Sequence, residues 1–352
     1  MEDMLPSSCS ERVDELDEFH KFQQDNEFII KGYRLYFNTT KKILRSLFLV
    51  HNETVNIWTH LVGALMFLMI ILSFVFSTDF SSNTLIYKSY IISLESEFTE
   101  TKNAIAFALN KFMKEISTSS IAKSFEKTCN STVTTVLNLL TEYESSTTME
   151  MEDVKKWPLF VFLASALICL TMSSCFHLFN AHSARIKVIM NSLDYAGIAI
   201  LICGSFFPLV YYLFFCNEFY IYLYLIAISV CSTCVFGMTF LSNFQDPHCR
   251  WFRGLIFLVL GLSGIFPICH IMFLPHAKEF TDALIYYVFM GVFYVMGVNI
   301  YIFRFPERFS SGKFDYIGNS HNIWHCMIVI AAIFHYLAAL ESYEKRKSLM
   351  CN

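Results

Sequence analysis

Two histidines, His321 and His325, stand four residues apart where the last apolar segment of the chain begins. On a helix this spacing puts both imidazoles on one face, one turn apart, where they can reach a single metal ion. Such pairs also arise by chance, but imidazoles at membrane depth are costly and normally serve a purpose. The pair therefore indicates part of a metal site whose other ligands come from elsewhere in the chain.

Polar residues at two other apolar segments can complete this site. Ser173 and His177 end the second apolar segment, and Asp194 begins the third. Three neutral imidazoles with one open position form the ligand set of a catalytic zinc site, where bound water ionises near neutral pH. We expect Asp194 to hold and deprotonate that water, and Ser173 to hydrogen-bond a polarised carbonyl or orient a ligand. His177 taken alone also fits a histidine near the lipid headgroups.

Further polar residues lie close to the same segments. His51 and Glu53 precede the first apolar segment, and we expect them to cap or buttress it rather than to bind metal. His182 and Ser183 follow the second segment and are expected to support the site from a loop. His270 is deep in the fifth segment, toward the opposite side of the membrane.

The elements that carry these residues are membrane spans. The chain has 352 residues, of which 55% are hydrophobic and only 16% charged, which is typical of a polytopic membrane protein. It has no basic stripe or recognition module for nucleic acid. Seven apolar segments are each long enough to cross the hydrocarbon core as a helix. They cover residues 55–77, 158–178, 193–215, 219–241, 252–274, 282–304 and 321–340.

The orientation follows from the Lys and Arg residues of the short loops, which accumulate on the cytosolic side. Arg185 and Lys187 lie between the second and third segments, whereas the connection between the third and fourth has no basic residue. The basic cluster at 345–347 disagrees but is outnumbered. We therefore predict an all-α protein with seven transmembrane helices, a cytosolic N-terminus and an extracellular or lumenal C-terminus. The zinc site then lies near the cytosolic face.

The remaining parts of the chain flank or interrupt this seven-helix domain at 51–341. Residues 1–30 are predicted to be an acidic mobile tail, and 31–50 an amphipathic helix in the membrane interface, with an ordinary soluble helix as the alternative. The long extracellular connection at about 78–157 is expected to contain helices, with a flexible loop as the alternative. Residues 342–352 form a short tail.

The twelve cysteines do not indicate a disulfide framework. Most of them, Cys216 included, lie in or near the apolar spans, and we expect them to pack there as small hydrophobic side chains.

Several motifs carry a resemblance to a known family. They are the stretch at 51–60, Ser173-x-x-x-His177, the stretch at 193–197, and the stretch at 306–315 leading into His321-x-x-x-His325. In this order they resemble the progestin and adipoQ receptor family, which includes the adiponectin receptors and the haemolysin III-like proteins. The resemblance implies seven helices with a cytosolic N-terminus. It also implies zinc on His177, His321 and His325, with Asp194 holding the zinc-bound water, and a ceramide-hydrolase activity known among adiponectin-receptor relatives.

Two functions are compatible with these features. The first is a zinc-dependent hydrolase that cleaves ceramide-like lipid amides and releases fatty acid, with Asp194 as the base and Ser173 assisting at the oxyanion. The second is a receptor with structural zinc that binds an extracellular protein or sterol through the loop at 78–157. The predicted spans carry no ring of charged residues, so the sequence does not indicate a pore. The plasma membrane is the expected location, and an endomembrane is the alternative.

Overall fold

This computed structural model describes residues 8–9, 21–76, 111, 154–274, 276–349 and 351. Most of the acidic tail and of the long connection at 78–157 therefore lies outside the described residues. Within them, seven helical stretches are long and apolar enough to cross a membrane, which confirms the seven spans predicted from hydropathy. They are α2 (Thr54–Phe76), α5 (Trp157–Phe179), α6 (Ala184–Leu213), α7 (Glu218–Met238), α9 (Arg250–Leu262) with α10 (Ile265–Ile271), α11 (Thr281–Phe303) and α12 (Ser320–Lys347).

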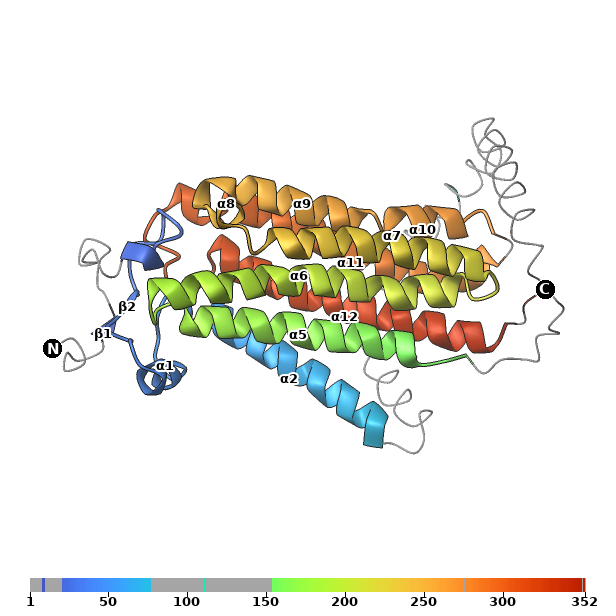
Figure 1. Cartoon of the computed structure of the whole chain (residues 1–352), viewed down its shortest axis with the longest axis horizontal. Helices are drawn as coiled ribbons and strands as arrows, with labels where there is room; N and C mark the ends of the chain where they lie inside the picture. Colours follow the sequence, from blue (N-terminus) through green and yellow to red (C-terminus); the bar gives the residue numbers. More distant parts are fainter. Residues whose placement is uncertain are drawn as a thin grey trace.

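The seven spans form one elongated bundle, with α2 tilted away from the others (Figure 1). Helix α12 packs against α2, α5, α6 and α11 and so holds the two halves of the bundle together. In α6, 61% of the apolar window is buried inside the protein, against 22% in α7, so α6 is central and α7 faces lipid. The helices that will carry the site, α5, α6 and α12, are the three with the largest buried share.

Helix α6 starts earlier than the third apolar segment. The Ser183 side chain accepts a hydrogen bond from the Ile186 backbone N–H at 3.3 Å and caps the helix there. The first turns of α6 mix apolar residues with Arg185, Lys187 and Asn191, so hydropathy locates the membrane-spanning part but misses this extension. As a result, Asp194 lies almost three turns inside the helix instead of at its beginning.

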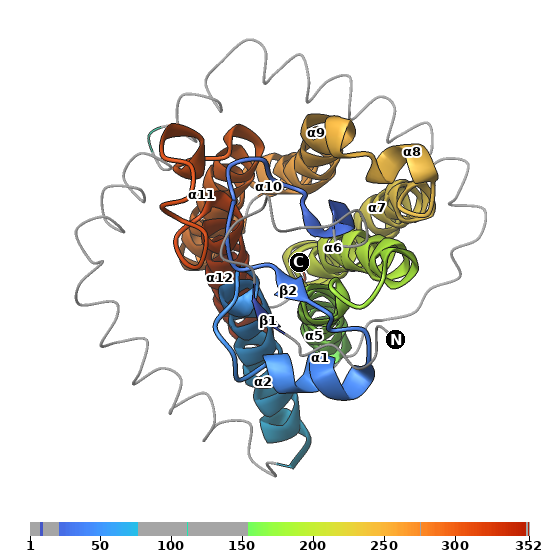
Figure 2. The ribbon, with the colours of Figure 1, turned by 90° about the vertical axis from the view of Figure 1, so that its left-hand side faces the viewer.

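The N-terminal segment is built from short elements that lie across one end of the bundle. These are β1 (Ser8–Cys9), η3 (Lys21–Gln23), β2 (Arg34–Leu35) and α1 (Thr40–Ser46), and β1 pairs antiparallel with β2. Within the range 31–50 the helix is confined to α1, and the chain before it is extended and turns at Gly32, whose φ is +83°. Figure 2 views this end and shows the blue segment crossing the ends of the helices.

Several contacts tie this segment to the bundle. Lys187 Nζ lies 2.6 Å from Asp25 Oδ2, and Arg304 pairs with Glu27 at 2.7 Å. The Gly312 backbone N–H also donates to the Phe28 carbonyl at 3.1 Å. These contacts fix the segment to the start of α6, to the end of α11 and to the loop that leads into α12.

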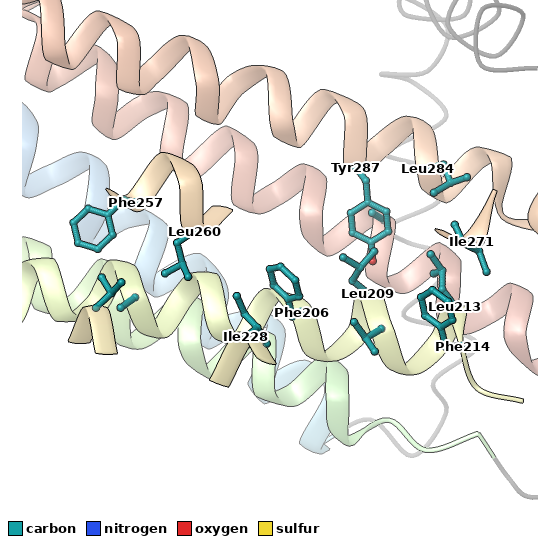
Figure 3. Close-up of a cluster of buried hydrophobic side chains, with 14 of the residues drawn as sticks. Phe206, Leu209, Leu213, Phe214, Ile228, Phe257, Leu260, Ile271, Leu284 and Tyr287 are labelled. Carbon is teal, nitrogen blue, oxygen red and sulfur yellow. The ribbon is translucent and has the colours of Figure 1, made fainter. Parts of the chain in front are cut away.

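Two large apolar clusters, out of four among the described residues, fill the bundle between the spans. One joins α2, α5 and α12 around Phe67, Phe162 and Leu170. The other joins α6, α7, α9, α10 and α11, and Figure 3 shows its side chains converging from these helices, among them Phe206, Leu209 and Tyr287. The remaining short elements, α8 (Ser242–Gln245), η5 (Pro247–Cys249), η6 (Ala277–Phe280) and η7 (Glu307–Phe309), connect the spans.

The prediction for Cys216 is wrong, because this cysteine forms a disulfide with Cys351. Cys216 lies just beyond the end of α6, and the chain after α12 returns to the same end of the bundle. The bond therefore joins the C-terminal tail to the connection between α6 and α7, at the end opposite to the N-terminal segment.

Candidate metal centre

The start of α12 is fixed by a side-chain cap. Asn319 Oδ1 accepts hydrogen bonds from the backbone N–H groups of His321 and Asn322, at 3.1 and 3.0 Å. The cap satisfies two N–H groups that have no partner within the helix. It also sets the position of the first two turns, on which His321 and His325 project side by side.

The structure brings the three predicted histidines together. His177 lies in the last turn of α5, and one ring nitrogen of each of His177, His321 and His325 lies within 4.8 Å of the others. The Nε2 atoms of His177 and His321 are only 3.1 Å apart. His177 and His325 are buried, and His321 is partly buried. Three imidazole nitrogens that converge at this spacing fit the donor set of one zinc ion.

A carboxylate orients His177. Glu53 Oε2 lies 2.8 Å from His177 Nδ1, so the ring donates a proton there and turns Nε2 toward the other histidines. Glu53 also accepts hydrogen bonds from Asn56 at 2.7 Å and Asn180 at 3.0 Å. Burial acts to raise the pKa of Glu53, but the adjacent His177 and the bond from Asn56 hold it well below its usual range. The carboxylate is therefore anionic where it faces the histidine.

His325 is oriented by the backbone of α2. Its Nδ1 lies 3.1 Å from the Asn56 carbonyl oxygen and 3.4 Å from Thr59 Oγ1, which leaves Nε2 for the centre. The Asn56 side chain in turn accepts a hydrogen bond from Asn322 at 2.7 Å. The beginning of α2 and the beginning of α12 are thus held together through Asn56.

The two predicted catalytic residues lie beside the histidines. Asp194 on α6 is 8% exposed and Ser173 on α5 is 2% exposed, one turn before His177. The Ser173 hydroxyl lies near the Asp194 carboxylate, and both side chains line the same cavity as His321 and His325. Carboxylate, hydroxyl and imidazoles therefore form one buried group contributed by three helices.

Two cavities meet at this group. A cavity of about 550 Å³ extends between α6, α9, α11 and α12, and its lining is mainly apolar apart from the end formed by Ser173, Asp194, His321 and His325. A smaller, polar cavity of about 120 Å³ lies on the side of the N-terminal segment and is lined by Glu53, His177 and Asp194, among others. The histidine cluster therefore lies between the large apolar cavity and the small polar cavity.

Comparison with known proteins agrees with this architecture. The family model described as Haemolysin-III related matches residues 48–99 and 129–336. The chain belongs to this family. It is 34% identical to Heptahelical transmembrane protein 4 of Arabidopsis thaliana, over 93% of this chain and 88% of that protein. It is 32% identical to Heptahelical transmembrane protein ADIPOR3 of Oryza sativa, over 94% of this chain and 90% of that protein.

An animal relative also matches. The Adiponectin receptor protein of Drosophila melanogaster is 29% identical over 90% of this chain and 56% of that protein. Together these matches confirm the resemblance read from the motifs: the chain is an adiponectin receptor-like, haemolysin-III-related protein that spans the membrane with several helices.

The remaining sequence-predicted residues of this haemolysin-III-related protein lie around the centre or away from it. His51 caps the start of α2: its Nδ1 accepts from the Glu53 backbone N–H at 3.1 Å, and its Nε2 faces the Ser46 carbonyl. His182 lies outside the three-histidine group, in the short turn after α5. His270 lies against Tyr224, at the other end of the bundle.

Sequence reasoning gave no role to two residues that touch the centre. Asn56 holds α2 and α12 together, and His60 stacks on His325 with ring centroids 3.7 Å apart. Among the described residues, neither ring nitrogen of His60 has a hydrogen-bond partner. The signal that could have found both is their spacing: Asn56 and His60 follow Glu53 at helical intervals, so they lie on one face of α2.

Proposed function

We propose that this protein is a zinc-dependent amide hydrolase of the membrane that cleaves ceramide-like lipids and releases a fatty acid. The observation that carries the proposal is the position of the three histidines and Asp194 at the polar end of a large apolar cavity. A lipid chain buried in that cavity presents its amide group to the histidines. Membrane lipids are therefore the proposed partners, as substrate and as product.

Zinc is the metal that the residues fit best. The donors would be three imidazoles, one of them oriented by a carboxylate, which is a donor set that zinc prefers. When bound, zinc supplies a Lewis acid for the amide carbonyl and acidifies water at neutral pH. The remaining chemistry is performed by side chains of this protein.

Asp194 is the proposed proton carrier. Its carboxylate accepts a proton from the attacking water and then gives it to the nitrogen of the leaving amine, which completes hydrolysis of the amide bond. Ser173 lies next to Asp194, where its hydroxyl donates a hydrogen bond to the carbonyl oxygen as negative charge develops there. The apolar walls of the cavity exclude bulk water and so strengthen these interactions.

We also propose that the end carrying the histidines faces the cytosol and that the C-terminus is extracellular or lumenal. The basic loop residues support this orientation. The Cys216–Cys351 disulfide at the opposite end supports it as well, since disulfides persist mainly in oxidising compartments. The plasma membrane remains the proposed location.

The deciding experiment is fatty acid release from a panel of ceramides by purified, zinc-loaded protein, with Asp194→Asn at matched zinc content as the control. Release by the wild-type protein and not by the variant supports hydrolysis with Asp194 as the base. No release from either protein, with one zinc per chain, contradicts the proposal.

A receptor with structural zinc is the second candidate, supported by the name of the Drosophila relative and by the long connection at 78–157. Its ligand would be an extracellular protein or a sterol. Deletion of residues 80–155 separates the two functions: a receptor loses its signalling response, whereas a hydrolase keeps its basal fatty acid release.

A further inference from the structure

The large cavity has a second polar point, far from the histidine centre. His335 on α12 lines the cavity and is 1% exposed. It follows His325 by ten residues, which corresponds to about 15 Å along the helix axis. An extended acyl chain of eighteen carbon atoms is longer than this distance. His335 therefore lies beside an inner carbon of such a chain, and not beside its end, if the amide group is at the histidines.

The imidazole ring of His335 is in contact with other side chains on most of its sides. Its Nδ1 lies 2.9 Å from the Met290 sulfur, and the ring centroid is 4.3 Å from that of Phe162 and 5.3 Å from that of Tyr287. The backbone of Ser205 lies close to the ring. Yet Nε2 has no hydrogen-bond partner among the described residues. A buried ring nitrogen without a partner is unfavourable, so this atom indicates a group that the protein itself does not supply.

The surroundings restrict what that group can be. Figure 3 shows Tyr287 extending from α11 toward Leu209 on α6, and both line the cavity with Phe206, so the walls here are apolar apart from uncharged groups such as the Tyr287 hydroxyl. No carboxylate, Lys or Arg of the described residues lines this end, since the charged residues of the lining are Asp194 and Arg253. A charged ligand group would therefore be unpaired at membrane depth. A hydroxyl group can donate a hydrogen bond to an imidazole nitrogen or accept one from it, and it carries no charge. It therefore fits both the Nε2 atom of His335 and the uncharged surroundings.

We propose that His335 binds a hydroxyl group on the acyl chain of the lipid, so that the preferred substrates are amides of mid-chain hydroxylated fatty acids. This inference rests on the proposed function only in assuming that the carboxyl end of the chain lies at the histidines. It names the class of substrate, and it can be tested by binding alone.

The test uses the purified full-length Asp194→Asn variant, so that no turnover interferes. Binding of three probes is measured by calorimetry or native mass spectrometry: octadecanoic acid, an isomer with a mid-chain hydroxyl, and an isomer with the hydroxyl next to the carboxyl group. We expect the mid-chain isomer to bind about tenfold more tightly than the other two, the gain from one hydrogen bond in a dry site. Equal affinities for the three acids would overturn the proposal.

Two substitutions complete the test. His335→Leu should remove the preference while octadecanoic acid still binds, and His335→Gln should restore part of it, because the amide group can also hydrogen-bond a hydroxyl. His270→Leu is the matched control, since this histidine lies outside the cavity lining and its loss should leave the preference unchanged. A preference that survives His335→Leu contradicts the proposal. A preference without any ceramide hydrolysis by wild-type protein would keep His335 as the hydroxyl-binding residue and reject only the enzyme and its substrates.

Discussion

Glu53 Oε2 and His177 Nδ1 lie 2.8 Å apart, although 124 residues separate them in the sequence. The carboxylate precedes α2, and the imidazole ends α5, so this contact joins the first two spans at the candidate metal centre. It fixes the tautomer of His177 and makes the ring a better donor for a cation. The contact is also the geometric feature that most clearly distinguishes a metal ligand from a histidine that only fills space.

Glu53→Gln should therefore weaken zinc binding. The variant keeps the shape of the side chain but loses its charge, so the affinity for zinc is expected to fall by about 10- to 100-fold. Competition with a chromophoric chelator measures this directly. The exposed Glu279 provides the matched control, because Glu279→Gln removes the same charge far from the histidines. Equal zinc affinity in wild type and Glu53→Gln would mean that the contact does not orient a metal ligand.

Asp194→Asn should separate binding from chemistry. The amide cannot accept the proton of the attacking water, so amide hydrolysis is expected to fall by about 10²- to 10⁴-fold while the zinc content stays at the wild-type value. Turnover and zinc are measured on the same preparation. Asp246→Asn, which changes an exposed acid outside both cavities, is the control. Loss of zinc together with turnover would assign Asp194 to the ligand set instead.

Arg34 should matter for stability as much as any residue of the core. Its buried guanidinium donates to the carbonyls of His177 at 2.7 Å and Leu178 at 2.8 Å, and to the Asn180 side chain at 2.6 Å. A lysine cannot make these contacts at once, because its ammonium group is not a planar fork. Arg34→Lys is expected to lower the free energy of unfolding by about 2–4 kcal/mol.

Thermal unfolding in detergent tests this expectation, and zinc retention during the same experiment reports on the end of α5. Arg45→Lys is the matched substitution at an exposed position of α1 and should leave the unfolding temperature unchanged. Similar unfolding temperatures for the two variants would show that the contacts of Arg34 contribute little.

Protonation of His51 should account for part of the pH dependence of the free energy of unfolding. Burial, reinforced by the nearby Arg34, lowers the pKa of His51 to about 3. In the unfolded chain its pKa is about 6.5, so below that pH the unfolded state binds a proton that the folded state does not. Stability from this residue is complete above about pH 6.5 and falls as the pH decreases toward 3. The expected loss between about pH 7 and pH 5 is on the order of 2 kcal/mol.

The contribution of His51 is isolated by comparing wild type with His51→Gln, both without metal, in thermal melts at the two pH values. The slope should be smaller in the variant, because glutamine does not titrate. An identical slope would assign the pH dependence to other groups.

The parts of this protein that follow from local periodicity could be predicted from the sequence. The seven spans follow from hydropathy, and the shared face of His321 and His325 follows from the helix repeat alone. That Asp194 lies in the third span also followed from hydropathy, although its position along α6 did not. These features depend only on residues that are close in the chain.

The parts that depend on packing between distant segments could not be predicted. Arg34 reaches the end of α5 across more than 140 residues, and Cys216 pairs with Cys351 across 135. His335 lies within an apolar run, and only the packing of α6, α11 and α12 shows that its Nε2 has no hydrogen-bond partner in the described part of the chain. The segment at 31–50 is amphipathic, and its composition did not reveal that part of it is an extended strand paired with β1.

Helix α12 links the two ends of this architecture. It runs without interruption from Ser320 to Lys347, which corresponds to about 42 Å. Two imidazoles of the candidate centre occupy its first turns, and the tail tethered by Cys351 follows its last turn. The disulfide ties the end of α12 to the connection that follows α6, the helix of Asp194. Two of the three helices that contribute to the candidate centre are therefore joined covalently at their far ends.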